Sequence, residues 1–313
     1  MNAGEQEAIW ASSNVLDLVG ALETQLSVYR DDSEVTRLNQ SAFRQPIPVE
    51  RRLFELLQLS QSLSKQTTGA FDLTTEPLIR LWRSCRADIR VPSESEISTA
   101  LADVGMSHVA LHPEERAIAF DREGMSINLG AIGKGYALDR VQEELAKTEA
   151  GDFLLHGGHS SLLARGVHAQ LNGWPVGIGN PLLTERRLGT ILLRDQAMAT
   201  SGSNIQYFRV GEKRYGHILD PRTGWPAAGH LSVTVVAPTA AEADALSTAF
   251  YVMQPDEVAD YCKSHPHIGA ILIPFPKRDR RVTPRIIGID PMFVYWDSDQ
   301  VKTRNDIKGN PPR

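Results

Sequence analysis

The chain has 313 residues, of which 42% are hydrophobic and 23% are charged, and these are ordinary values for a globular protein. This length permits one large domain or two closely joined subdomains around a sizeable core. The formal net charge of −5 argues against a nucleic-acid partner, and the sequence has no apolar run of the roughly 18 residues that a transmembrane segment needs.

The chain begins with a segment that has no visible targeting signal. MNAGEQEAIWASS lacks the basic and apolar regions of a signal peptide, so a cytoplasmic location is expected if the chain is complete. We assign residues 1–13 to an N-terminal segment that is a candidate for disorder. Cys85 and Cys262 lie far apart and near no motif, and we expect both to be free thiols.

Helix and strand patterns follow without a strict order. Apolar spacing, in two cases after a glycine turn, predicts helices over 14–26, 49–67, 70–82, 93–105, 130–148, 240–253 and 255–265. Short apolar runs predict strands over 108–112, 117–121, 125–128, 152–158, 160–167, 174–181, 188–202, 214–221, 231–239, 268–275 and 284–290. The first three strands are expected to form a meander and the next two a hairpin. The stretch around 83–97 reads as a loop, and the polar tail 297–313 is expected to fray.

The mixture of these elements predicts an α+β fold. A doubly wound sheet is disfavoured because the helices and strands do not alternate as βαβ units. We expect mixed or antiparallel sheets flanked by helices, in a single chain with two intimately packed subdomains. The folded domain is predicted over residues 14–290, and a polar C-terminal tail over 291–313.

The first motif with a chemical meaning is NLGAIGKGYALD, residues 128–139. Glycines allow backbone N–H groups to approach a ligand closely, and the start of a helix attracts anions. Lys134 adds a full positive charge, so the block suits a phosphate. The pattern is neither a Walker A loop nor GxGxxG, and a plain helix start with a solvated Lys134 is the alternative.

The second motif is AEADALSTAF, in which Asp244 and Thr248 are four residues apart on one helix face, with Ser247 between them. Carboxylate and hydroxyl oxygens are hard ligands that suit Mg²⁺. The alternative is an N-cap aspartate and a threonine that bonds back into its own helix. We expect Asp244 to lie in an exposed cleft, so that Asp244→Ala would remove metal-dependent activity and leave the fold intact.

The third motif is HILDPRTGWP, residues 217–226. Asp220, Arg222 and Thr223 surround a turn, and His217 precedes it, where an imidazole can move protons near neutral pH. A hydrogen-bonded structural histidine is the alternative. Together the three motifs supply a phosphate cradle, ligands for a hard cation and a candidate base, which suits a magnesium-dependent reaction on a phosphoric anhydride.

Six blocks of the sequence resemble the ApbE-type FAD:protein FMN transferase family, in the order in which that family has them. The blocks are LSVYRDDSEVTRLN, TGAFDLTTEPLIRLW, NLGAIGKGYALD, ATSG, HILDPRTGWP and LSVTVVAPTAAEADALSTA. The resemblance runs from about residue 14 to about residue 290. It implies an ApbE-like fold and an enzyme that splits the FAD pyrophosphate with Mg²⁺. The FMN is then attached through a phosphoester to a serine or threonine of an acceptor protein, and AMP is released.

The resemblance also implies roles for individual residues. His217 matches the residue that activates the acceptor hydroxyl. The positions that match metal ligands are Asp244, Thr248 and the backbone oxygens of Ala131 and Ser247. The positions that match FAD contacts are Tyr29, Ala70, Phe71, Asp72, Asn128, Lys134 and Ile218. Asp220, Arg222 and Thr223 are expected to brace the turn that presents His217.

Four features depart from the family pattern. Asn128 stands where the family usually has aspartate, His159 where it often has aspartate, and Ser203 follows ATSG where an aspartate is usual. The chain also lacks the strand that family members carry before the first helix. Relatives are often exported lipoproteins, so the location depends on whether the chain is complete. Two other functions share the same residues: an FAD pyrophosphatase that gives FMN and AMP, and a non-catalytic FAD-binding protein.

Overall fold

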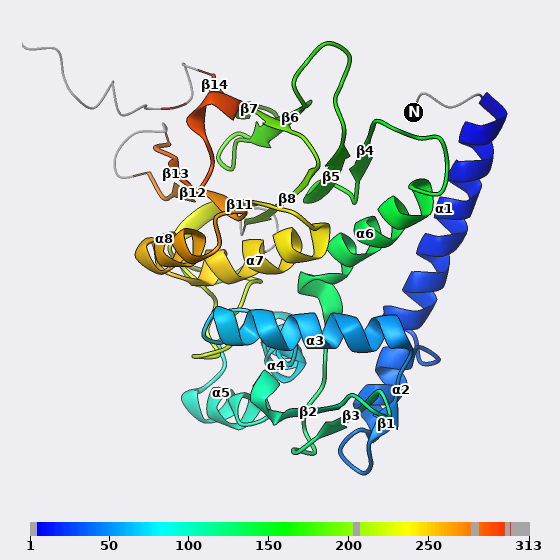
Figure 1. The fold of residues 1–313 in the computed structure, drawn as a ribbon. Coiled ribbons are helices and arrows are strands. Elements are labelled where there is room, and N and C mark those ends of the chain that lie inside the picture. Colours follow the sequence, from blue (N-terminus) through cyan, green and yellow to red (C-terminus); the bar gives the residue numbers. More distant parts are fainter. Residues whose placement is uncertain (1–4, 203–206, 277–281, 298–300, 302–313) are drawn as a thin grey trace, which may run out of the picture.

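The structure is a computed structural model that describes residues 5–202, 207–276, 282–297 and 301. A half built on sheets lies above a half built mainly on helices (Figure 1). The helices are α1 (Glu5–Leu26), α2 (Glu34–Ser41), α3 (Arg51–Gln66), α4 (Glu76–Ala87), α5 (Glu94–Leu101), α6 (Gly133–Leu145), α7 (Ala240–Val252) and α8 (Pro255–Ser264), with 3-10 turns η1 (Met106–His108), η2 (Leu129–Ala131) and η3 (Pro291–Phe293).

The strands form four small or medium sheets, and every pair of named strands is antiparallel. They are β1 (Ile47–Pro48), β2 (Val109–His112), β3 (Ala117–Phe120), β4 (Phe153–His156), β5 (Ser161–Arg165), β6 (Trp174–Gly179), β7 (Arg187–Leu193), β8 (Gln196–Gly202), β9 (Tyr207–Val210), β10 (Lys213–Gly216), β11 (His230–Ala237), β12 (Gly269–Pro274), β13 (Arg285–Ile287) and β14 (Val294–Trp296). The α+β class with antiparallel sheets flanked by helices is confirmed.

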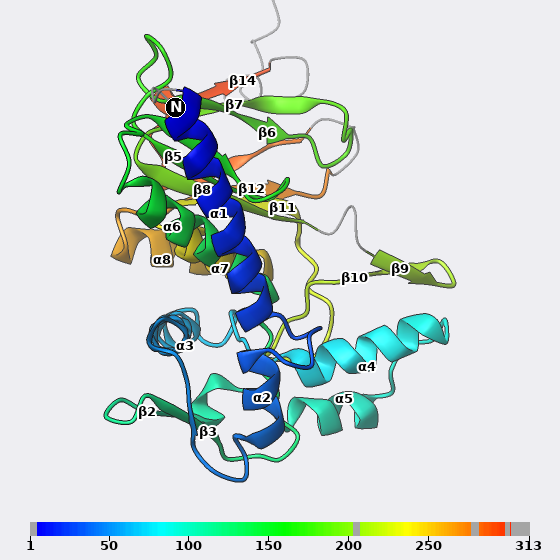
Figure 2. The same ribbon diagram turned by 90° about the vertical axis from the view of Figure 1, so that its right-hand side faces the viewer.

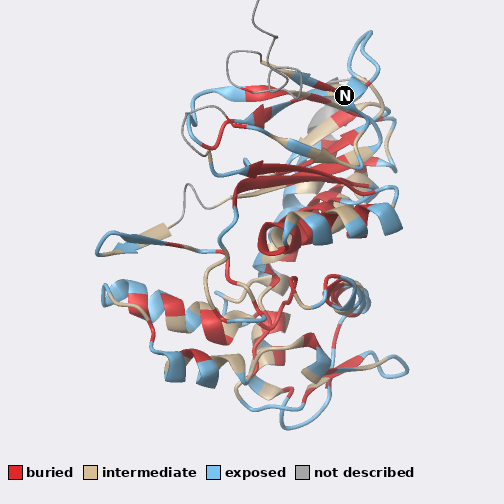
Figure 3. Cartoon of the chain, turned by 90° about the vertical axis from the view of Figure 1, so that its left-hand side faces the viewer, coloured by how far each residue is buried: buried red, intermediate tan, exposed pale blue. Residues whose placement is uncertain are grey.

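A six-stranded sheet in the order β13-β12-β11-β8-β5-β4 organises the upper half. Successive side chains of a strand point to opposite faces, and β12 follows this rule. Ala270 and Leu272 face the helices, whereas Ile271 and Ile273 face the three-stranded sheet β14-β7-β6. Buried residues are concentrated in the central strand β11 of the six-stranded sheet and in α7 (Figure 3). The sheet is therefore covered on both faces, and α7 lies in the centre of the molecule.

The lower half packs α2–α5 around the small sheet β1-β3-β2. Its core is continuous with the helix-covered side of the large sheet, because buried residues of α3, such as Leu57, belong to the same cluster as Phe250 of α7. A second, smaller cluster joins α4 to β10 through Trp82 and Tyr215. The segment 128–133, which contains η2, connects the two halves and leads into α6 (Figure 1).

Several predicted elements differ from the structure at their ends. The helix predicted over 14–26 begins already at Glu5, because the preceding residues include glutamate, glutamine and alanine, which are good helix formers. The segment 83–97 is not one loop, since α4 continues to Ala87 and α5 starts at Glu94. Within the part assigned to the tail, Val294–Trp296 forms β14 beside β7.

Two strand predictions are wrong. The single strand predicted over 188–202 is two strands, β7 and β8, in different sheets. Residues 125–128 form no strand, and the third strand beside β2 and β3 is Ile47–Pro48, far away in sequence. The backbone at 125–128 is held by side chains instead, since the amide of Asn39 bonds both the N–H and the carbonyl of Ile127. The predicted hairpin at β4 and β5 is confirmed. In the described part of the chain, no helix is long and apolar enough to cross a membrane.

Candidate active site

The glycine-rich loop and the late helix meet at Gly135, near the start of α6. A Cβ atom at this position would lie 1.9 Å from the carbonyl oxygen of Ala240, the first residue of α7. Only glycine allows the two helices to approach so closely. Asp139, one turn further along α6, accepts hydrogen bonds from the N–H groups of Ala240 (2.8 Å) and Ala241 (2.9 Å), and so satisfies the N-terminus of α7. The glycine-rich motif and the α7 motif, about a hundred residues apart in the chain, therefore contact each other directly.

This contact surrounds the carboxylate of Asp244, which is only 5% exposed. Oδ2 accepts the Gly135 N–H at 3.0 Å, and Oδ1 accepts the Ser161 hydroxyl at 3.1 Å. Nζ of Lys134 lies 3.7 Å from Oδ1. Burial raises the pKa of the Asp244 carboxyl, and Lys134 and the two hydrogen bonds oppose this rise. The expected exposed cleft is thus wrong for Asp244, and Asp244→Ala would leave a buried N–H and a buried hydroxyl without their acceptor.

A group of hydroxyls extends from Asp244 along α7. The hydroxyls of Ser247 (2.9 Å) and Thr248 (3.4 Å) both donate to the Asp244 carbonyl. Ser201, in the ATSG segment of β8, lies 2.9 Å from the Ser247 hydroxyl and 3.4 Å from that of Thr248. The fourth block of the sequence thereby joins the same site. Thr248 keeps lone pairs that a further ligand can use.

The second block joins the third through the backbone. The Asn128 N–H donates to the carbonyl of Leu73 at 2.8 Å, directly after the AFD segment. Ala70 and Phe71 are each 1% exposed and their backbone N–H groups bond to Thr67, so both residues pack in the core and the structure does not present them to a cofactor as the family match predicted. The buried Asp72 carboxylate accepts from Thr74 and from the Met106 N–H, and burial raises its pKa. Through these hydrogen bonds the buried Asp72 carboxylate holds the loop that contains the AFD segment in place.

The His217 turn is built by local hydrogen bonds. The Asp220 carboxylate accepts from the backbone and guanidinium of Arg222, and Asp220 also exchanges backbone bonds with Trp225 and Gly224. Gly224 has φ +76° and its carbonyl accepts the Trp82 indole N–H at 2.8 Å, which ties the turn to α4. His217 is exposed, whereas the neighbouring Ile218 is buried. The turn thus presents an imidazole on a rigid backbone.

Tyr29 lies in the connection between α1 and α2, outside these networks. Its side chain is 75% exposed, and its hydroxyl accepts a bond from Arg83 of α4 at 3.3 Å. The Arg83 guanidinium also lies 5.8 Å from the ring centroid. An exposed ring of this kind is free to stack on a flavin or adenine face, as its match to the family predicts.

The model of the ApbE family matches residues 4–272, most of the chain. The chain belongs to the ApbE family. Its relatives include an FAD:protein FMN transferase of Klebsiella pneumoniae, 31% identical over 264 residues that cover 84% of this chain and 81% of the relative. An FAD:protein FMN transferase of Treponema pallidum is 30% identical over 302 residues, 91% of this chain and 83% of that protein.

Solved ApbE structures have the same fold. The apo form of the flavinyl transferase ApbE of Pseudomonas stutzeri superimposes with a TM-score of 0.79 at 28% identity, covering 91% of this chain and 89% of that one. The flavin transferase ApbE of Vibrio cholerae gives a TM-score of 0.78 at 26% identity, with 91% and 89% covered. The expected ApbE-like fold is confirmed.

The donor atoms near Asp244 fit the magnesium ion that the family resemblance implies. They are hard oxygens: one carboxylate, the Thr248 hydroxyl, and the predicted backbone oxygens of Ala131 and Ser247. Each carboxylate oxygen accepts one bond from the protein and so has a lone pair left for a cation. No cluster of three or more His, Cys, Asp or Glu occurs among the described residues. The oxygen donors suit a hard cation that keeps several waters.

The departures from the ApbE pattern have different structural settings. The Asn128 amide donates to Glu76 Oε2 at 2.6 Å and its Oδ1 accepts the Gly130 N–H at 2.8 Å. A carboxylate at position 128 would face that of Glu76, so the neutral amide suits this chain. His159 is exposed in the β4–β5 turn, and Ser203 lies outside the described residues.

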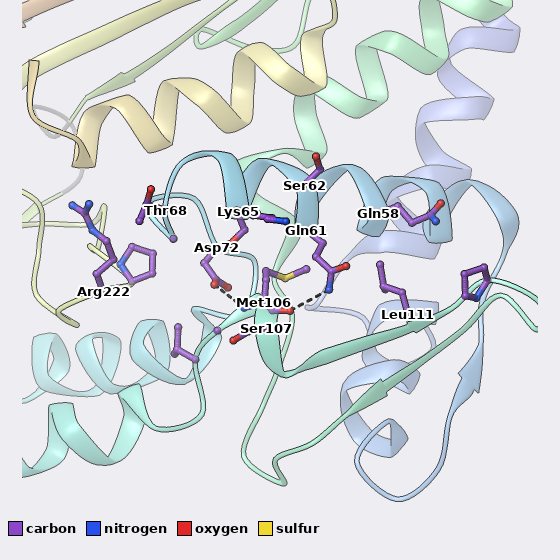
Figure 4. Close-up of a pocket in the computed structure, with 16 residues that line it drawn as sticks. Gln58, Gln61, Ser62, Lys65, Thr68, Asp72, Met106, Ser107, Leu111 and Arg222 are labelled. Atoms are coloured by element: carbon purple, nitrogen blue, oxygen red, sulfur yellow. Dashed lines mark hydrogen bonds between the residues drawn. The ribbon is translucent and has the colours of Figure 1, made fainter. Parts of the chain in front are cut away.

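A cavity of about 810 Å³ lies away from the Asp244 network, between α3 and η1 (Figure 4). Asp72 and Arg222 lie on its lining, and Gln61 and Lys65 of α3 point into the same region. Of the predicted site residues, Asp72 alone lines it. The cavity is therefore bordered by Asp72 of the AFD loop and Arg222 of the His217 turn. Lys134 and Asp244 do not line it.

The sequence did not indicate several residues that shape the site. Ser161 supports Asp244 from 83 positions away, and no local pattern marks it. Asp139 looked like an ordinary helix residue of the third block, yet it satisfies the start of α7. Glu76 and Trp82 connect α4 to the loop at Asn128 and to the turn at Gly224. All four act through contacts between distant segments.

Proposed function

We propose that this chain is an FAD:protein FMN transferase that uses Mg²⁺ to cleave FAD, attaches FMN through a phosphoester to a serine or threonine of an acceptor protein, and releases AMP. The curated relatives named FAD:protein FMN transferase, at about 30% identity over most of the chain, support this activity. The observation that carries it is the junction of α6 and α7. There the Lys134 ammonium and the Gly135 N–H both lie beside the Asp244 carboxylate.

This junction suits a pyrophosphate and its counter-ion. The N-terminus of α6 and Lys134 provide positive charge for phosphate oxygens. Asp244, Thr248 and the carbonyls of Ala131 and Ser247 would hold the magnesium ion. When bound, this ion neutralises charge that develops on the phosphoryl group. Ser161 and the Gly135 N–H keep the Asp244 carboxylate in one orientation.

His217 is the proposed general base. It takes the proton of the acceptor hydroxyl while that oxygen forms a bond to the phosphorus on the FMN side of FAD. The bond from this phosphorus to the bridging anhydride oxygen breaks, and the oxygen leaves with AMP. Tyr29 is proposed to stack on an aromatic face of FAD, and the backbone around Asn128 and Ile218 to line the cofactor. Because His217 is exposed, an acceptor chain can reach it.

The decisive experiment uses Asp244→Asn. The amide has nearly the same volume and can still accept the Gly135 N–H, so the protein should fold while the carboxylate charge is lost. Purified protein, FAD, Mg²⁺ and a candidate acceptor protein are mixed, and the FMN adduct is detected by intact mass and AMP by chromatography. We expect the variant to lose roughly 100-fold or more in turnover. It should also lose binding of Mn²⁺, measured by electron paramagnetic resonance.

Glu242→Gln is the matched control, because it makes the same chemical change on α7 outside this network. It should keep both activity and metal binding. AMP and free FMN formed without an acceptor would favour a pyrophosphatase, in which water replaces the hydroxyl. Tight FAD binding with no AMP from the wild-type protein would instead favour a flavin-binding protein and contradict the proposal.

A further inference from the structure

The hairpin formed by β9 and β10 projects from the body of the protein beside α4 (Figures 2 and 3). Its register pairs Phe208 with Tyr215 and Arg209 with Arg214. Phe208 and Tyr215 stack at 5.5 Å and contact Trp82 of α4, so this face is the attached one. Since side chains alternate along a strand, Arg209 and Arg214 lie on the opposite face.

The hairpin of β9 and β10 carries a pair of like charges directly opposite each other. Like charges directly opposite one another on two strands destabilise a hairpin, and Arg209 and Arg214 are such a pair. Both guanidinium groups lie over the ring of Tyr207, at 6.0 Å and 3.5 Å from its centroid. Lys213 is also exposed, on the side that faces α4, with its Nζ 5.6 Å from the Tyr215 ring centroid. Glu212 is the single carboxylate between β9 and the end of β10. Positive charge is thus concentrated here although the whole chain carries a net charge of −5.

The positive charge continues onto α4, which packs under the hairpin through Trp82. Arg83 and Arg86 are both exposed on this helix. Arg83 also bonds the hydroxyl of Tyr29, the residue proposed to stack on FAD. We use the name basic face for five exposed basic residues that lie on α4 and on both sides of the hairpin: Arg83, Arg86, Arg209, Lys213 and Arg214. Arg83 adjoins the proposed cofactor contact Tyr29, and the last residue of β10 directly precedes His217.

We propose that the basic face binds an acidic segment of the acceptor protein and brings its serine or threonine to His217. The inference rests on the proposed function, because only a transferase needs a protein acceptor. Complementary charge of this kind accelerates encounter and sets orientation more than it adds affinity.

Two other anionic partners fit the face less well. FAD is expected at Lys134 and Asp244, and hydrogen bonds and ion pairs tie those residues to α6, α7 and β5, not to the hairpin. An anionic membrane is usually met by basic residues together with exposed apolar ones. On the described hairpin, Phe208 and Val210 are partly buried, and neither is among the large exposed hydrophobic residues. A polar, acidic polypeptide is the better match.

The test uses Arg209→Glu/Lys213→Glu in the full chain. Its probe is a fluorescein-labelled peptide of about 12 residues that contains one threonine and alternating aspartate and glycine, compared with the same peptide carrying asparagine. We expect the wild-type protein to prefer the aspartate peptide and the double variant to bind it about tenfold more weakly. The preference should also fall when salt is raised from about 50 mM to about 300 mM, because salt screens exposed charges.

Arg44→Glu/Lys263→Glu is the matched control, with the same change of charge. Arg44 is exposed before β1 and Lys263 is exposed on α8, and the control should bind like the wild type. The hairpin variant should not lose Tm, because Arg209→Glu turns the like-charged pair with Arg214 into an opposite-charged one.

Equal binding of both peptides, or unchanged binding by the hairpin variant, overturns the proposal. Weaker FAD binding in the hairpin variant would show that the basic face binds the nucleotide and would contradict the proposal. Binding to phosphatidylglycerol vesicles that the hairpin variant weakens, with no effect on peptide binding, would show that the basic face binds a membrane and would also contradict it. AMP release from FAD, measured on the same samples, reports the proposed function separately.

Discussion

Asp244 and His217 belong to the same proposed site, but the protein holds them in different ways. The Asp244 carboxylate is buried and takes its partners from β5 and α6, segments 83 and 109 residues away in the chain. The His217 side chain is exposed, and the turn that presents it is closed by bonds among residues 218–227. One group depends on the whole fold, and the other depends mainly on ten residues and their attachment to α4.

This difference predicts how each part responds to mutation. A change that adds volume where α6 meets α7 must also change the packing of the two helices, so activity and stability should fall together. A change of the His217 side chain removes an exposed group, so activity should fall much more than stability. The predictions below test this separation.

His217→Ala should have the largest effect on activity and almost none on stability. Loss of a positioned general base typically lowers the rate by about 10²–10⁴-fold, while an exposed side chain adds little to folding. The measurement is the rate of FMN attachment to an acceptor, together with FAD affinity and Tm. His159→Ala removes another exposed imidazole, from the β4–β5 turn, and should change none of these. An unchanged rate in His217→Ala would mean that another group accepts the proton.

Gly135→Ala should damage stability and activity together. A Cβ atom would meet the Ala240 carbonyl oxygen at 1.9 Å, so α6 and α7 must separate and the Gly135 N–H must leave Asp244. We expect a loss of about 1–3 kcal/mol in the free energy of unfolding, measured with urea. Metal affinity should fall with it.

Gly133→Ala is the matched control for that substitution, two residues earlier in the same helix. Its Cβ would meet only the Cβ of Leu129, at an ordinary 3.7 Å. Alanine favours helix by about 0.5–1 kcal/mol over glycine, so the control should be neutral or more stable. If both variants lose the same stability, the close approach of the two helices is not what requires Gly135.

The same contrast explains what the sequence could predict. The turn at 217–226, the glycine-rich start of α6 and the hairpin of β4 and β5 follow local rules of spacing and turn chemistry, and the structure has them where they were expected. The junction of α6 with α7 was predicted only in outline, from the chemistry that the motifs share. The burial of Asp244 was missed, because helical spacing places it on a face without saying what covers that face.

Contacts between distant segments account for the other errors. Residues 125–128 have a strand-like pattern, but Asn39 from α2 takes the backbone bonds of Ile127, and β1 takes the place beside β3. Ser161 and Glu76 carry no local signal, since each acts on a partner that the fold brings near. Tertiary contacts outweigh local propensity at these positions.

Asp139 gives an effect that is seen only in the dependence of stability on pH. Burial raises the pKa of its carboxyl from 3.8 to about 6, against the opposing bonds from the Ala240 and Ala241 N–H groups, with Arg140 and Glu242 as its nearest charges. Between these two pH values the folded protein binds more protons at this residue than the unfolded chain does. The free energy of unfolding therefore falls as pH rises from about 4 to about 6, by at most about 1.4 kcal/mol per pH unit, and this contribution is constant above that range.

Asp139→Asn removes this group, so the stability of the wild type relative to the variant should decrease with pH across that window. Urea unfolding at several values between about pH 4.5 and pH 7.5 measures the difference. This range avoids Glu96, whose pKa is lowered to about 2, first by its bond to Arg90, and whose stabilisation is lost only at lower pH. Asp17→Asn, an exposed carboxylate on α1, should leave the profile unchanged. A pH-independent difference between wild type and Asp139→Asn would show that Asp139 stays charged while it holds the start of α7, and that the buried junction tolerates a carboxylate without a raised pKa.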